Sequence, residues 1–95
     1  MFIVELTYKV ALSEVDKHLE AHIKYLNIQY DLGNFIASGR KEPRNGGIIV
    51  SKISNKDDLL KALSEDPFKK HNLADYNIIE FIPSKVGNGF ENLIS

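Results

Sequence analysis

Residues 13–33 are the longest stretch of the chain with one periodicity, and that periodicity is helical. At about 100° per residue, one stripe of the helix carries these side chains: Val15, Leu19, Ile23, Leu26 and Tyr30. Ser13 is a suitable N-cap with Asp16 three residues later, and Gly33 is a suitable left-handed stop. His22 lies within the same stripe, where an aliphatic residue is expected. The pattern predicts a single helix with an imidazole on its buried face.

The rest of the chain supplies four strands and one further helix. The predicted strands are residues 2–10, 34–39, 48–53 and 76–82. A second helix at 56–65 begins after Asn55, a favourable N-cap, and stops at Asp66-Pro67, which can also open a short new turn. Residues 40–47 contain Pro43 and an Asn-Gly-Gly turn, so they are predicted to form the loop of a hairpin.

The resulting order β-α-β-β-α-β is typical of an α+β, ferredoxin-like fold with both helices on one face of an antiparallel sheet. Ile48, Ile49 and Val50 are consecutive apolar residues, a pattern that indicates cover on both sheet faces. Two helices cover only one face, so we predict a symmetric homodimer. We expect the domain to span residues 1–83, followed by a glycine-punctuated C-terminal tail at 84–95.

Composition narrows the function classes. The 95 residues have a net charge of −1, which argues against a nucleic-acid partner, since such proteins usually carry a basic face. There is no cysteine, so thiolate chemistry and disulfides are excluded. The N-terminus lacks a basic leader and no segment approaches the length of a membrane span, so we expect a cytoplasmic protein with no membrane partner.

Two residues are candidates for chemistry. His22 is either a core or interface histidine satisfied by backbone carbonyls, or a general acid or base, since imidazole titrates near neutral pH. Asp66 is either a helix cap alone, or a cap whose carboxylate also holds an imidazole N–H and orients it. His18 and His22 are four residues apart, but no third ligand stands at a familiar metal-site spacing, so we expect neither a metal nor another cofactor.

A third group of residues follows the second strand. Gly39 permits close backbone approach, and Ser38 offers a hydroxyl. Arg40 and Arg44 are either solvated or able to clamp a small carboxylate or phenolate. The expected partner is therefore a small molecule, with Ser38, Arg40 and Arg44 as its binding residues.

Several short motifs, in order, match a known family. The opening strand, the segment V-D-K-H-L-E-A-H-I-K-Y-L with His22, D-L-G-N-F-I-A-S-G, P-R-N-G-G-I-I-V and E-D-P-F occur in sequence over residues 1–83. In these segments the chain resembles the YciI-like (YCII-related) family. It departs from many relatives at Gly39-Arg40, where they have Gly-Pro.

The resemblance implies a dimeric ferredoxin-like α/β barrel with a pocket in which His22 faces Asp66 and Ser38 lies nearby. It also implies proton-transfer chemistry, such as isomerisation or elimination, on a small anionic or cyclic compound. The first hypothesis is thus an acid–base enzyme with a His22–Asp66 dyad. The alternative is a ligand-binding or interaction module that keeps the fold and pocket without catalysis, and a purely structural assembly subunit is a third option.

Overall fold

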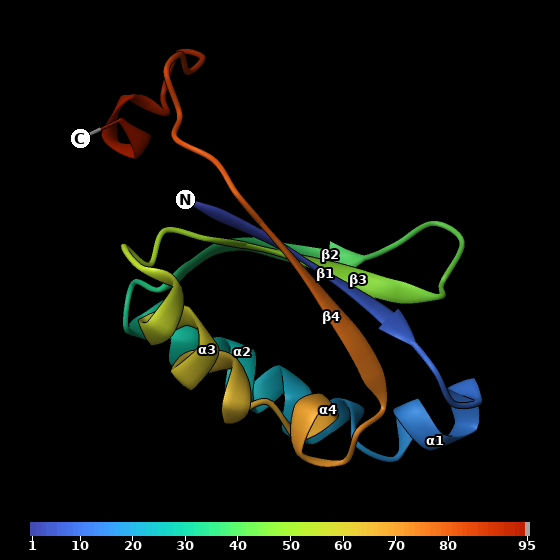
Figure 1. Ribbon diagram of the computed structural model, residues 1–95. Helices are drawn as coiled ribbons and strands as arrows, with labels where there is room; N and C mark the ends of the chain where they lie inside the picture. The colour runs from blue at the N-terminus through green and yellow to red at the C-terminus, as the bar shows by residue number, and fades with distance from the viewer. Residues whose placement is uncertain (95) are drawn as a thin grey trace.

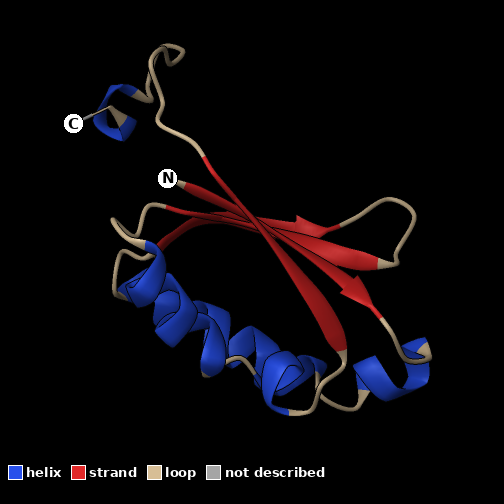
Figure 2. Ribbon diagram, viewed as in Figure 1, coloured by secondary structure: helices blue, strands red, loops and turns tan. Residues whose placement is uncertain are grey.

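The computed structural model describes residues 1–94, so Ser95 of the expected tail lies outside the described residues. The elements, shown in Figure 1 and by type in Figure 2, are β1 Phe2–Tyr8, α1 Leu12–Asp16, α2 Leu19–Asp31, β2 Phe35–Arg40, β3 Gly46–Ser51, α3 Lys56–Ser64, α4 Pro67–Lys70, β4 Ala74–Glu80 and a 3-10 helix, η1, Glu91–Leu93. None of the helices within residues 1–94 combines the length and apolar composition needed to cross a membrane.

The four strands form one antiparallel sheet in the order β2-β3-β1-β4. Helices α1 to α4 lie on one face of this sheet, and η1 lies apart from them in the C-terminal segment (Figure 1). This arrangement confirms the predicted ferredoxin-like α+β fold and the predicted β2–β3 hairpin.

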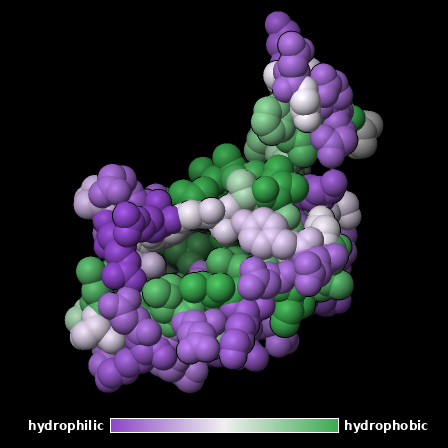
Figure 3. Space-filling model, turned by 180° about the vertical axis from the view of Figure 1, so that it is seen from behind, coloured by the Kyte–Doolittle hydropathy of each residue, from purple (hydrophilic) through white to green (hydrophobic). Residues whose placement is uncertain are grey.

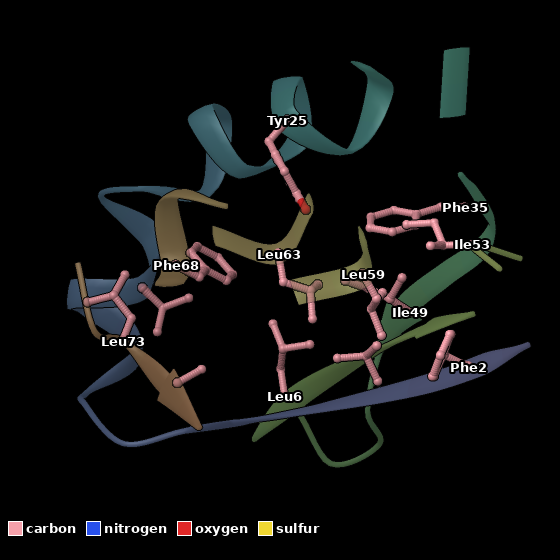
Figure 4. Packing of buried hydrophobic residues seen from close by; sticks show 13 residues of the cluster. Phe2, Leu6, Tyr25, Phe35, Ile49, Ile53, Leu59, Leu63, Phe68 and Leu73 are labelled. Carbon is pink, nitrogen blue, oxygen red and sulfur yellow. The ribbon is translucent and has the colours of Figure 1, made fainter. Parts of the chain in front are cut away.

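The core lies between the sheet and the helices (Figure 4). On β1, the helix-facing positions Phe2, Val4 and Leu6 are buried, as period-two alternation requires. Leu59 and Leu63 of α3 belong to the same core cluster. The sheet and the helices are thus joined by one apolar layer.

The single helix predicted at 13–33 is wrong, because the chain breaks between α1 and α2 at Lys17 and His18. Ala11, not Ser13, occupies the N-cap position of α1, and no side chain caps it. At the break, the His18 ring stacks on His71 at the end of α4, with ring centroids 4.0 Å apart. This contact joins residues distant in sequence, which helical periodicity does not encode.

The buried face of α2 includes residues outside the predicted stripe and leaves out one residue within it. Tyr25 and Gln29 are buried, whereas Ile23 is 48% exposed. The true face is rotated so that His22, Tyr25 and Gln29 follow one another at helical spacing toward the core. His22 is therefore inward-facing as expected. Of the predicted stripe, Val15 is buried and Leu19, Leu26 and Tyr30 pack against the core, so Ile23 is the one residue that departs from it.

The predicted end of α2 and the predicted starts of α3 and α4 agree with the structure. Gly33 has φ +76°, which confirms the left-handed stop after α2. The Asn55 side chain accepts a hydrogen bond from the Asp58 amide and caps α3 as predicted. Asp66 caps α4, with Pro67 at its start, so the short turn after α3 is a helix of four residues.

The strand limits move by a few residues at their ends. β1 ends at Tyr8 and β4 at Glu80, so Val10 and Ile82 are not in strands, and Ile82 is 88% exposed. β3 begins at Gly46, inside the predicted loop. Beyond β4 the chain leaves the body on the side away from the helices (Figure 1), and the division into domain and tail at residue 83 stays a prediction.

Candidate functional site

A cavity of about 570 Å³ opens between α2 and the strands β1, β2 and β3. Its wall is mostly apolar, and the polar side chains that line it are Tyr8, Asp16, His22, Ser38, Arg40 and Arg44. On the face seen in Figure 3 the surface is hollowed, and both hydrophobic and hydrophilic side chains surround the hollow. Four of the five residues predicted to form the site line this one cavity; the fifth, Asp66, lies behind His22.

Asp66 is completely buried, and three donors satisfy its carboxylate. Its Oδ1 accepts hydrogen bonds from the Phe68 backbone N–H at 3.0 Å and from His22 Nδ1 at 2.7 Å. Its Oδ2 accepts one from the Tyr76 hydroxyl at 2.5 Å. The sequence allowed two interpretations of Asp66, a helix cap and a partner of the imidazole. Both are present together, and both hydrogen bonds end on the same oxygen, Oδ1.

Two contacts fix the orientation of the His22 ring: the hydrogen bond at Nδ1 and the stacking of an aromatic ring on its face. Phe68 stacks on it with ring centroids 3.9 Å apart and planes 3° apart, and the His22 side chain is 12% exposed. The Asp66 carboxylate accepts and cannot donate when ionised, so the neutral imidazole carries its proton on Nδ1. Nε2 is then the ring nitrogen available to a ligand in the cavity.

Two tyrosines surround Asp66. Burial raises the pKa of Tyr76, and the Asp66 carboxylate beside it raises this pKa further. Burial likewise raises the pKa of Tyr25, whose hydroxyl donates to the Ala62 carbonyl at 2.6 Å. Both phenols are thus kept protonated as donors, and Tyr76 in particular remains a donor to Asp66.

The β2 strand forms the opposite side of the cavity. Ser38 and Arg40 stand two residues apart and so share a strand face, and Ser38 pairs with Ile49 in the register of β3. The Ser38 Oγ lies 2.5 Å from the Tyr30 hydroxyl of α2. Ser38 is therefore positioned by a contact that spans from the sheet to the helix.

Arg44, in the connection between β2 and β3, is tied to α1. Its Nη2 lies 2.5 Å from Asp16 Oδ1, and this hydrogen bond raises the pKa of Arg44. Tyr8 lines the cavity beside this pair; burial raises the pKa of Tyr8, and the Arg44 charge partly offsets that rise. Arg44 is near the cavity as expected, but its charge already has a partner.

The sequence of the chain matches the model of a known protein family. The model of the YCII-related domain matches residues 1–82. The chain belongs to the YCII-related family.

Among solved structures, this YCII-related chain is similar to the 5-chloro-2-hydroxyhydroquinone dehydrochlorinase (TftG) from Burkholderia phenoliruptrix AC1100, in complex with 2,5-dihydroxybenzoquinone. The TM-score is 0.73 at 15% sequence identity, and the match covers 84% of this chain and 91% of that one. A likeness at this identity shows the shared fold alone. No curated protein matches the chain.

Sequence reasoning missed the supporting residues of the YCII-related site. Tyr76 was expected only as a strand residue, although its alternation with Ala74 and Ile78 placed it on the helix-facing side of β4. Asp16 was expected in a capping box and instead binds Arg44. Phe68 was noted only as part of the E-D-P-F motif, and no feature of the sequence indicates that its ring stacks on His22.

Within residues 1–94, no group of three or more His, Cys, Asp or Glu side chains is arranged to hold a metal ion. One nitrogen of the His22 imidazole contacts a buried carboxylate and the ring lies on the cavity wall, an arrangement chemically able to take up or release a proton at the other nitrogen.

Proposed function

We propose that this YCII-related protein is a small acid–base enzyme that moves a proton on a small anionic or cyclic compound. The observation that carries the proposal is the 2.7 Å contact between His22 Nδ1 and Asp66 Oδ1, with His22 on the wall of a cavity of about 570 Å³. In this proposal His22 is the general base, acting through Nε2, and Asp66 orients the ring and stabilises its protonated form.

The substrate class comes from the shape and lining of the cavity. Its apolar wall suits a flat ring, and Arg40 and Ser38 suit an oxygen anion on that ring. The structural relative is named for dehydrochlorination of a chlorinated hydroquinone, an elimination in which a proton and a chloride leave the same molecule. We infer an isomerisation or elimination of this kind, carried out in the cytoplasm.

The decisive experiment measures turnover of chlorinated hydroquinones, beginning with 5-chloro-2-hydroxyhydroquinone, by the native protein and by His22→Ala. A positioned general base contributes about 10²–10⁴ in rate, so kcat should fall by that factor. His18→Ala is the matched control, because His18 is the N-cap residue of the same helix, α2, and does not line the cavity. Full turnover by His22→Ala would end the proposal.

A second measurement needs no substrate. Nitrogen NMR of the neutral His22 ring should show the proton on Nδ1, because Asp66 accepts it there. A proton on Nε2 would contradict the proposed base. Compounds that bind with equal affinity to the native protein and to His22→Ala, without turnover by either, would favour the ligand-binding module instead.

A further inference from the structure

The two arginines of the cavity are electrostatically different. The Arg44 side chain is 30% exposed and pairs with Asp16. None of the ion pairs found within residues 1–94 includes Arg40, although Arg40 lines the same cavity. One cation of the site therefore has its counter-charge within the protein, and the other is left for a ligand.

The position of Arg40 in the sheet supports this difference. Arg40 is the last residue of β2 and pairs with Gly47 of β3, which in turn pairs with Leu6 of β1. All three line the cavity, and because Gly47 has no side chain, nothing from β3 stands between Arg40 and the apolar floor at Leu6. An anionic group on an apolar body can thus meet both at once.

An anion that approached Arg44 would meet a cost that is absent at Arg40. It would have to displace Asp16 from the guanidinium or lie beside the Asp16 carboxylate, which also lines the cavity. Like charges at such a short distance repel each other. The Asp16–Arg44 pair therefore directs an anion toward Arg40.

We propose that Arg40 binds the anionic group of the ligand, and that Asp16 withholds Arg44, so that the cavity selects compounds with a single carboxylate or enolate group on a small apolar body. This assignment rests on the proposed function in taking the cavity as the substrate site. The sequence alone assigned anion binding to both arginines. Here Arg40 binds the anion, and Arg44 stays paired with Asp16.

The test uses benzoate and its neutral isostere benzamide as probes, with binding followed by calorimetry and by amide NMR shifts of the cavity residues. Arg40→Gln should lower the affinity for benzoate roughly tenfold or more, because a charge-assisted hydrogen bond is lost. The affinity for benzamide should not change. Arg40→Lys keeps the charge and should retain part of the benzoate affinity, which checks that the cavity is intact.

Asp16 supplies the matched variant. Asp16→Asn should raise the affinity for benzoate severalfold, because it frees Arg44, and the double variant Asp16→Asn with Arg44→Gln should return to the native value. An unchanged benzoate affinity in Arg40→Gln would overturn the assignment, as would an equal loss for benzamide, no effect of Asp16→Asn, or no binding of millimolar benzoate by the native chain. Failure of the proposed function would show instead as turnover retained by His22→Ala, a result that leaves these titrations unchanged.

Discussion

Asp66 is the residue that holds the candidate site in place. It is completely buried and accepts from an imidazole, a backbone amide and a phenol, and no buried side-chain polar atom within residues 1–94 lacks a partner. Full satisfaction makes a buried carboxylate tolerable, since an unpaired one would be costly. The orientation of His22 is therefore tied to the packing of α4 and β4.

The phenol beside Asp66 predicts how stability depends on pH. The pKa of Tyr76 is raised above its unfolded value of 10.0, so the folded state keeps a proton that the unfolded state loses in base. The stabilising effect is complete below pH 10 and is lost above it, at about 1.4 kcal/mol per pH unit for each such group. Urea unfolding between pH 8 and pH 11 measures this slope.

The variant Tyr76→Phe isolates this tyrosine in the same titration. It should be less stable than the native protein at neutral pH, because Asp66 Oδ2 loses its donor. Its stability should fall less steeply in base, with the remaining slope due chiefly to Tyr25, whose pKa is also raised. Equal slopes in the native protein and in Tyr76→Phe would contradict this account.

At the scale of elements, local signals predicted what depends on neighbours in sequence. Asn55, Gly33 and Pro67 each favour one backbone geometry, and all three sites were predicted correctly. The break between α1 and α2 was missed because it lies where His18 stacks on His71, a contact between residues far apart in the sequence. The candidate site followed the same rule: its residues were named from the sequence, but the partners Tyr76 and Asp16 were not.

The β2–β3 hairpin predicts a contrast between two adjacent glycines. A Cβ at Gly46 would lie 1.8 Å from the Leu6 carbonyl oxygen, a backbone atom of β1 that cannot move without breaking the strand pairing. A Cβ at Gly47 would meet the Gly39 carbonyl oxygen at 3.1 Å, which a small shift relieves. Gly46→Ala should therefore cost roughly 4 kcal/mol or more, as severe core overpacking does.

Gly47→Ala is the matched control for this hairpin test and should cost about 1 kcal/mol. Denaturant midpoints of the two variants give the comparison. Similar midpoints would show that the strands separate more easily than the register implies.

At the scale of the whole molecule, the sheet face without helices is the unexplained surface. Ile3 and Ile79 pair across β1 and β4 on this face, and Ile79 is 51% exposed. Contiguous exposed apolar residues are typical of interaction sites. We propose that a second copy of the chain covers this face, in keeping with the homodimer predicted from the sequence.

Sedimentation of two isoleucine variants tests the homodimer. Ile79→Asp should shift the protein from dimer to monomer, because a desolvated charge would lie in the interface. Ile28→Asp is the control, since Ile28 is 58% exposed but lies on α2, on the opposite side of the molecule. A native protein that sediments as a monomer would exclude the proposed pairing.

The triple use of Asp66 also bears on how such a protein changes over evolutionary time. A lineage that no longer needed the proposed reaction could lose His22 by drift, but replacing Asp66 would remove the cap of α4 and the acceptor of Tyr76. Asp66 would then be retained because folding needs it, even after the loss of His22. If the proposed reaction holds, the presence of the histidine, and not of the aspartate, should distinguish active descendants of this chain from inactive ones.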